Sequence, residues 1–315
     1  MDKENKTYYR PIQLLGFEIL HNYNILIFLL IFIFYSLTLI GNATIIILVS
    51  SSPSLHHPMY FFLCNLSISD LILTTSIVPN MMYGVLKGGI TMSIDACITQ
   101  FQCFGIAIMS ECLLLAAMSY DRYLAICNPL HYIHIMNKEN CLRLVILCWF
   151  LSFAMSFVMM ILVRKLNYCG PNIIYHFFCD FAPILQLSCS TTFKVELVQK
   201  FLACPITVIP LVFIIVTYTH IIITILRIPS NSGRQKAFST CSSHLAVVGT
   251  FYGSLITLYV VPSNSKNTLN ANKILSLLYT VITPLLNPII YSLKNMEIRL
   301  ALGKHISVWK RTYRR

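Results

Sequence analysis

The chain has 315 residues, of which 57% are hydrophobic and only 11% are charged. Soluble domains carry about 25% charged residues, so this composition excludes an ordinary soluble domain and indicates a membrane protein. The net charge of +12 does not indicate a nucleic-acid partner, because seven of the 23 basic residues lie in 294–315, where they would meet the anionic lipids of the cytoplasmic leaflet.

The first 24 residues are expected to form a short polar tail. They contain no apolar core followed by a small-residue cleavage site, so we expect no cleavable signal peptide and the first span has to act as the insertion signal. Asn5-Lys6-Thr7 fits the sequon for N-glycosylation, which is used only outside the cell. We therefore expect a glycan on Asn5 and an extracellular N-terminus.

Apolar segments follow one another along the rest of the chain. A bilayer core requires about 20 helical residues, and the pattern predicts an all-α membrane protein with a seven-helix transmembrane domain over 25–293. The expected spans are Ile25–Ser50, Pro58–Leu86, Ala96–Cys127, Cys141–Val163, Val195–Arg227, Lys236–Val261 and Lys273–Leu293. The last three spans should be joined by a turn at Ile228–Arg234 and a loop at Pro262–Asn272. In the basic segment 294–315, Asn295–Ile306 predicts a short amphipathic helix along the inner leaflet.

Polar side chains interrupt three of these apolar spans, at Asn42, Asp70 and Glu111. Asp70 lies about 12 residues into the second span, near the middle of the membrane at ~1.5 Å per residue. Glu111 shares a helical stripe with Phe104 and Ile108, and this stripe should face the bundle interior because an acid is unfavourable in lipid. Each intramembrane acid is either a functional group or a buried hydrogen-bond hub.

The loop Arg164–Lys194 is long and holds Cys169, Cys179 and Cys189 at even spacing. With Cys97 at the start of the third span they form a set of four, which allows three pairings. The alternative is a metal site built from the ligand-type side chains of this loop, namely His176, Cys179, Asp180 and Cys189. Oxidation of the cysteines outside the cell would exclude that site, so we expect no metal there.

Four stretches carry a resemblance to a known family. Met118–Cys127 reads MSYDRYLAIC, and Leu55–Asp70 reads LHHPMYFFLCNLSISD. Lys236–Leu245 reads KAFSTCSSHL, and Pro284–Asn295 reads PLLNPIIYSLKN, which contains an NPxxY pattern. With these stretches the chain resembles the vertebrate olfactory receptors, a branch of the rhodopsin-like G-protein-coupled receptors, over almost its whole length.

The resemblance implies a switch that transmits ligand binding to the stimulatory G protein of olfactory neurons, which raises cyclic AMP. The switch residues that it implies are Asp121, Arg122, Tyr123, Tyr218, His244, Asn287, Pro288 and Tyr291. It also implies two disulfides, which are Cys97–Cys179 and Cys169–Cys189.

The resemblance also concerns the polar residues inside the spans. Asn42 resembles the first-helix Asn of rhodopsin-like receptors, and Glu111 is implied to lie across from Asp70. Two carboxylates in one dry site cannot both be ionised without a cation. The pair is therefore expected either to share a proton or to hold a small cation such as sodium.

The ligand is expected between the helices, below the long loop. Inward-facing stripes predict the pocket residues Phe104, Gly105, Ile108, Leu202, Ile206, Tyr252, Leu255, Tyr259 and Thr280. This set is apolar with two phenol hydroxyls, which suits a small neutral volatile.

We expect a multi-pass plasma-membrane receptor that is not an enzyme. The alternatives are a multi-span transporter and a receptor of the same fold that acts outside the olfactory epithelium. Transporters usually show paired halves with broken helices, and no internal repeat is visible in this sequence. An enzyme needs a nucleophile–base or metal constellation, and no His, Cys or Ser motif converges with the acids by spacing.

Overall fold

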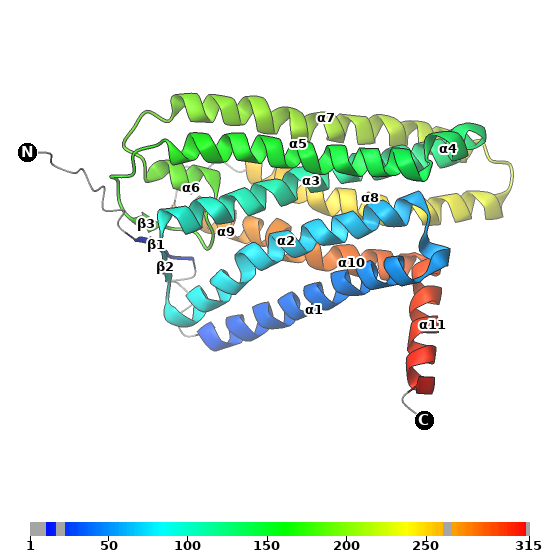
Figure 1. Ribbon diagram of the computed structural model, residues 1–315, viewed down its shortest axis with the longest axis horizontal. Coiled ribbons are helices and arrows are strands. Elements are labelled where there is room, and N and C mark those ends of the chain that lie inside the picture. Colours follow the sequence, from blue (N-terminus) through cyan, green and yellow to red (C-terminus); the bar gives the residue numbers. More distant parts are fainter. Residues whose placement is uncertain (1–10, 17–22, 261–265, 313–315) are drawn as a thin grey trace, which may run out of the picture.

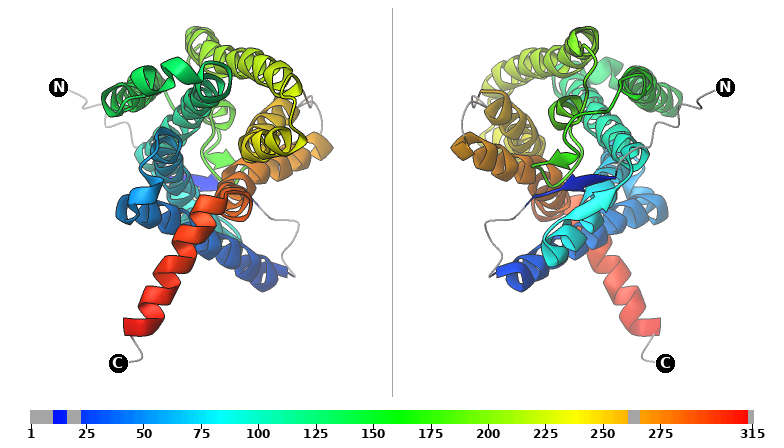
Figure 2. Two further views of the ribbon diagram at one scale, coloured as in Figure 1. Left: turned by 90° about the vertical axis from the view of Figure 1, so that its right-hand side faces the viewer. Right: turned by 90° about the vertical axis from the view of Figure 1, so that its left-hand side faces the viewer.

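The computed structural model describes residues 11–16, 23–260 and 266–312. Long helices run side by side, with short strands across one end of the bundle and a single helix, α11, projecting sideways from the other (Figure 1). We name these ends the sheet end and the α11 end. Seen along the bundle, the helices form a ring that the strands cross at the sheet end (Figure 2).

The bundle contains seven long helical segments within the described residues, which confirms the predicted fold class. They are α1 (Asn24–Ser51), α2 (Pro58–Lys87), α3 (Ile94–Cys127), α5 (Lys138–Arg164), α7 (Phe193–Leu226), α8 (Asn231–Val260) and the continuous run of α9 (Lys266–Leu277), η3 (Leu278–Ile282) and α10 (Thr283–Lys294). The shorter elements are β1 (Ile12–Leu14), η2 (Pro53–Leu55), β2 (Ile90–Met92), α4 (Pro129–Ile135), β3 (Ile173–Ile174), α6 (Phe181–Gln186) and α11 (Met296–Thr312). Six of the described segments are long and apolar enough to cross a membrane, and α8 completes the bundle.

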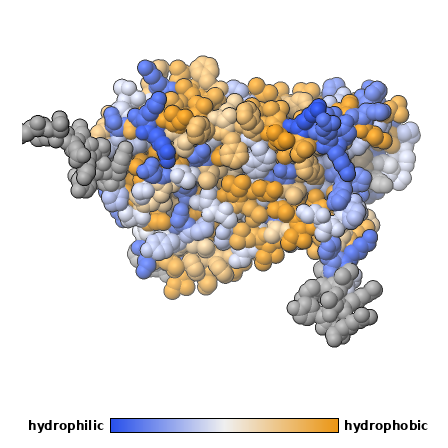
Figure 3. Space-filling model, viewed as in Figure 1, coloured by the Kyte–Doolittle hydropathy of each residue, from blue (hydrophilic) through white to orange (hydrophobic). Residues whose placement is uncertain are grey.

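On the face of the bundle seen in Figure 3, the side chains are mainly apolar over the middle and more hydrophilic towards both ends. On α1, for example, Ile25, Ile40 and Ile47 are each at least 60% exposed. Such surfaces suit the hydrocarbon core of a bilayer, where the helix satisfies its own backbone groups. In contrast, α3 packs against α2, α5 and α7, and the polar side chains of its middle, such as Ser110 and Glu111, lie inside the bundle.

The N-terminal segment is more than a tail, which corrects the sequence prediction. β1 is the middle strand of a three-stranded sheet, with Ile12 opposite Met92 of the antiparallel β2 and Gln13 opposite Ile173 of the parallel β3. The side chain of Leu14 in β1 is 1% exposed and packs into the core beneath the sheet. The strand thus closes the sheet end by pairing with two loops that lie far away in the sequence.

Several predicted boundaries were also wrong. The expected loop Pro262–Asn272 contains the start of α9 at Lys266, and the expected turn Ile228–Arg234 is shorter because α8 begins at Asn231. The hydroxyl of Ser230 accepts the backbone N–H of Gly233 and caps that helix start. The amphipathic helix α11 is longer than predicted and continues to Thr312.

The last bundle helix contains a π-helical segment, η3, within which the backbone ladder is widened. The hydroxyl of Thr283 donates to the carbonyl of Leu278 five residues earlier, at 3.0 Å. Single π turns inside α-helices are rare and frequently mark functional sites. On the far side of this turn, Asn287 and Tyr291 are buried.

Candidate functional site

A polar cluster lies in the middle of the bundle, where α1, α2, α3 and α10 meet. Asp70 is fully buried, and the amide of Asn287 donates to its two carboxylate oxygens at 3.1 and 3.0 Å. The carboxyl group of Glu111 lies close enough to that of Asp70 to interact with it, so the two acids are neighbours as the resemblance implied. From α1, the amide of Asn42 donates to the carbonyls of Thr38 and Pro284, which ties α1 to α10.

This cluster has oxygen atoms without partners. Asn42 Oδ1, Glu111 Oε1 and Asn287 Oδ1 are buried and accept no hydrogen bond. A buried acceptor without a partner is unfavourable by about 1–3 kcal/mol. Carboxylate and amide oxygens are the ligands that hard cations take in proteins, so the residues present fit a small cation.

The candidate ligand region lies between this cluster and the sheet end. Phe104 of α3 packs on the main hydrophobic core and also on a second core beneath the sheet. Its ring lies 5.2 Å from that of Phe178 in the long loop and 5.8 Å from that of Tyr279 in η3. Phe104 therefore connects the loop, α3 and the π-helical segment.

The other predicted pocket residues have mixed surroundings. Ile108, Ile206, Tyr252 and Leu255 are buried, and Leu202 packs beside the core beneath the sheet. Thr280 is buried, and its hydroxyl donates to the carbonyl of Ser276. The side chain of Tyr259 lies outside the described residues.

Gly105 faces a neighbouring helix. A Cβ atom at this position would lie 3.1 Å from Ser156 Oγ of α5, a contact tighter than is usual. The same hydroxyl donates to the carbonyl of Gln102. The glycine lets α3 and α5 approach closely, in the way that small residues do in membrane helices, and its contact with ligand stays a prediction.

The long loop is held by two disulfides, Cys97–Cys179 and Cys169–Cys189, which are the pairings that the resemblance implies. The first pair is fully buried, whereas both cysteines of the second are exposed. Because Cys179 and Cys189 are oxidised, they cannot supply thiolate ligands to the alternative metal site.

Two titratable groups of this loop are shifted by their surroundings. Burial, together with the nearby Lys273, lowers the pKa of His176 to about 3, so its ring is neutral. The His176 ring stacks on Phe177 at 4.7 Å, and its Nδ1 accepts the backbone N–H of Phe178. Burial raises the pKa of Asp180, which caps α6 by accepting the backbone N–H of Phe181.

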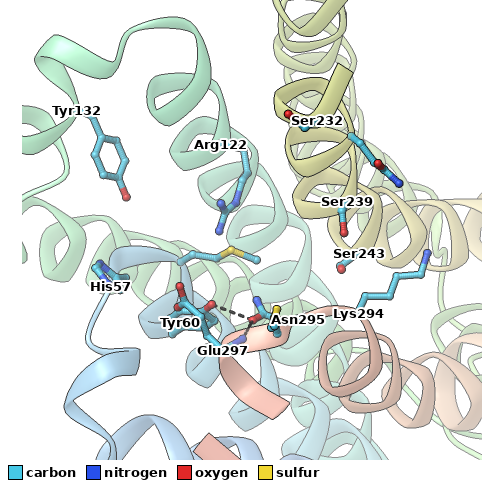
Figure 4. Close-up of a pocket in the computed structure, with 13 residues that line it drawn as sticks. His57, Tyr60, Arg122, Tyr132, Ser232, Ser239, Ser243, Lys294, Asn295 and Glu297 are labelled. Atoms are coloured by element: carbon cyan, nitrogen blue, oxygen red, sulfur yellow. Dashed lines mark hydrogen bonds between the residues drawn. The ribbon is translucent and has the colours of Figure 1, made fainter. Parts of the chain in front are cut away.

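A second candidate site is a cavity of about 690 Å³ at the α11 end. Arg122 of α3 points into it, facing residues of α2, α8 and the junction between α10 and α11 (Figure 4). The lining residues include His57, Tyr60, Arg122, Tyr132, Ser239, Ser243, Lys294, Asn295 and Glu297. Most of the residues that line this cavity are polar or charged, in contrast to those of the candidate ligand region.

Asp121 and Arg122 form only a loose ion pair. Arg122 Nε lies 3.8 Å from Asp121 Oδ2, which is beyond hydrogen-bonding distance, and has no hydrogen-bond partner. Instead, the hydroxyl of Tyr132 in α4 donates to Asp121 Oδ1 at 2.9 Å. The sequence reading missed Tyr132, although its place in the stretch after MSYDRYLAIC could have drawn attention to it.

Tyr218 and His244 link α7, α8 and α3. His244 Nε2 lies 3.2 Å from the carbonyl of Leu115, which can only accept, so this nitrogen carries the proton. Nδ1 therefore accepts the hydroxyl of Tyr218, at 2.8 Å. Both side chains are buried, so the pair connects the three helices inside the bundle.

The remaining predicted switch residues are Tyr123, Tyr291 and Pro288. Tyr123 packs beside His220 of α7 with ring centroids 6.1 Å apart. Tyr291 is fully buried and its hydroxyl has no hydrogen-bond partner. Pro288 packs on Gly41 of α1, where a Cβ atom would lie 2.9 Å from the proline ring. The predicted glycosylation site, Asn5, lies outside the described residues.

Comparison with known proteins gives one consistent result. A family model described as olfactory receptor matches residues 30–308. The chain is 43% identical to human olfactory receptor 11L1 over 96% of its own length and 94% of the relative's. It is 42% identical to human olfactory receptor 2A12, covering 98% of both chains, and 40% identical to mouse olfactory receptor 5H17, covering 98% of this chain and 99% of the relative.

Proposed function

Because the chain belongs to the olfactory receptor family, we propose that it binds a small, mostly apolar volatile and activates a stimulatory G protein, which raises cyclic AMP. In general terms it is an odorant-sensing G-protein-coupled receptor and a multi-pass membrane protein, and it is not an enzyme.

The cavity at the α11 end is the observation that carries the coupling proposal. A protein helix inserted there would meet the guanidinium of Arg122, which is always charged and has unused hydrogen-bonding capacity. Beside the cavity, Leu130 and Ile133 on α4 are 87% and 78% exposed, outside the membrane-spanning segments. Exposed apolar side chains next to a polar cavity favour docking of a protein partner.

We propose that the α11 end faces the cytoplasm and the sheet end faces outside, in the plasma membrane. The basic residues of α11 support this orientation, because positively charged segments favour the cytoplasmic side. Two disulfides at the sheet end support it as well, because they persist in an oxidising compartment.

The ligand is proposed to bind among Phe104, Ile108, Ile206, Tyr252 and Leu255, below the long loop. This region is apolar, which favours neutral molecules over acids. Binding shifts a two-state equilibrium towards an arrangement in which Tyr218 and His244 separate and the cavity at the α11 end widens.

A cell-based cyclic-AMP assay with volatiles of different functional groups tests this proposal. At least one neutral volatile should raise cyclic AMP in cells that carry the parent receptor. Arg122→Ala should reach the surface at normal density and give no response, whereas the matched control Arg143→Ala, at an arginine paired on the surface with Glu139, should respond like the parent. A full response from Arg122→Ala at normal surface density contradicts the coupling role.

We further propose that the cluster at Asp70 and Glu111 binds a sodium ion in the resting receptor. The unpartnered oxygens of Asn42, Glu111 and Asn287 support this, because a cation would supply what they lack. Replacing sodium by a large organic cation should then raise ligand-free signalling, and Glu111→Gln should abolish that dependence. Insensitivity of the parent to sodium would favour a shared proton.

A further inference from the structure

The start of α11 is fixed by a side chain from a different helix. The hydroxyl of Tyr60, in the first turn of α2, donates to Asn295 Oδ1 at 3.0 Å across 235 residues of sequence (Figure 4). Asn295 is the residue at which the chain leaves α10 and turns into α11.

Asn295 Oδ1 has two further donors. It accepts the backbone N–H groups of Glu297 and Ile298, at 3.0 and 3.3 Å, and so caps α11. The backbone N–H of Asn295 in turn bonds to the carbonyl of Tyr291, at 3.0 Å. A single residue therefore ends α10 with its backbone N–H, while its side-chain oxygen caps α11 and accepts the Tyr60 hydroxyl.

The Tyr60 hydroxyl also faces the coupling residues. Tyr60 lines the same cavity as Arg122 and is close enough to Arg122 and to the Glu297 carboxylate to interact with both. Its ring is buried, with 5% of the residue exposed, so the hydroxyl is held in place by packing. Tyr60 thus lies between the charged side chain of the switch and the α10–α11 junction.

The rest of α11 is anchored independently. Ile298 and Ala301 are buried in the same core as Leu55 of η2, and Ser51 Oγ lies 3.0 Å from His305 Nε2. Loss of the Tyr60 hydrogen bond would therefore free the α10–α11 junction without detaching α11.

We propose that Tyr60 is a positioning residue for coupling, which through Asn295 holds the α10–α11 junction against α2 and keeps the cavity in its resting shape. This inference rests on the proposed coupling function. A net hydrogen bond contributes about 0.5–1.5 kcal/mol, so its loss should raise ligand-free signalling by about 2- to 10-fold.

The test uses the full-length receptor and two variants that break the contact from opposite sides. Tyr60→Phe removes the hydroxyl and keeps the ring. Asn295→Ser keeps a good helix cap but has a side chain too short to reach Tyr60. Both should raise ligand-free cyclic AMP at unchanged maximal response and surface density, and the double variant should show no further rise because the two residues form one contact. Tyr83→Phe is the matched control, at a tyrosine of α2 that is 54% exposed.

Hydrogen exchange on the purified receptor gives a readout that is independent of signalling. Tyr60→Phe should accelerate exchange of the first amides of α11 several-fold, and Tyr83→Phe should not. Unchanged exchange overturns the proposal, as does unchanged ligand-free cyclic AMP at equal surface density in a receptor whose parent responds. A fall in basal and maximal signal in the same proportion also overturns it, because that is the result of a merely structural role. If the parent and Arg122→Ala give equal cyclic AMP with every volatile, the proposed coupling function is wrong. The exchange rates then still test whether Tyr60 holds the start of α11 through Asn295.

Discussion

The two ends of the bundle are closed by different kinds of interaction. At the sheet end, a buried disulfide, a strand ladder and an apolar core hold the loops together. At the α11 end, single side-chain hydrogen bonds such as Tyr132 to Asp121 and Tyr60 to Asn295 border a polar cavity. A covalent link and a core resist deformation, whereas a hydrogen bond contributes only about 0.5–1.5 kcal/mol. We therefore expect the sheet end to keep its geometry when a ligand binds, and the α11 end to rearrange.

The largest effect is expected from cutting the covalent link at the sheet end. Cys179→Ser leaves Cys97 unpaired in a buried core, and loss of a native disulfide lowers the free energy of unfolding by about 2–5 kcal/mol. We expect little receptor at the cell surface, measured by flow cytometry. Cys169→Ser should lose less because that pair is exposed, and Cys204→Ser, at an exposed free cysteine, should match the parent. Normal surface density and response of Cys179→Ser would contradict the structural role of the pair.

An intermediate effect on stability is expected from lowering the pH, which acts on His176 at the sheet end. The pKa of His176 is about 3 in the folded receptor, below the ordinary value of about 6.5. Its contribution to stability is therefore complete above pH 6.5 and is lost as the pH falls towards 3. Between pH 7 and pH 5 the loss is about 2 kcal/mol, measured as the free energy of unfolding of purified receptor.

The matched variant for this test is His176→Gln, which cannot be protonated. It should show a loss of stability on acidification that is about 2 kcal/mol smaller. Asp180, whose pKa is raised by burial, contributes with the opposite sign in both proteins, so the difference isolates His176. Equal pH dependence of the two proteins would mean that His176 is not held neutral by its surroundings.

The smallest effect on stability is expected from a substitution at the α11 end. Its main result should be a change in ligand-free signalling. Tyr132→Phe removes the donor to Asp121 and frees Arg122 to rearrange, which should raise ligand-free cyclic AMP about fivefold, the equivalent of about 1 kcal/mol. Asp121→Asn should act in the same direction. Tyr175→Phe, at a tyrosine of the long loop that is 57% exposed, is the control. If Tyr132→Phe left basal signalling and thermal stability unchanged, the contrast between the two ends would be weaker than the contacts indicate.

The hydrophobic pattern of the sequence was sufficient to predict the helices of the bundle. It was not sufficient to predict the elements and contacts at the two ends. Each apolar span can be recognised from its own residues alone, and the inward position of Ile108 and Glu111 follows from helical periodicity. The start of α9 was missed because the stretch KNTLNANK is polar and carries no apolar period. The π turn was missed because nothing in the residues Leu278–Ile282 distinguishes it from an ordinary helix.

The candidate sites were predictable to a similar degree. Asp70, Glu111 and Arg122 are conspicuous because a charge inside an apolar span needs an explanation. Tyr60 and Tyr132 are not conspicuous, since a tyrosine is common in such sequences and its partner cannot be read from its neighbours. For Tyr60 that partner lies 235 residues away, and only the packing of α2 against the α10–α11 junction brings the two together.

The position of β1 has a consequence for the order in which the receptor assembles. Its residue Gln13 is opposite Thr91 of β2 and Ile173 of β3, so the middle strand of the sheet is synthesised first and its two neighbours follow 78 and 160 residues later. Until β3 has emerged from the ribosome, the strand has an unpaired edge, and unpaired edges invite association with other chains. The nascent receptor therefore passes through a stage at which its first helices can already be inserted while its first strand still lacks one of its two partners.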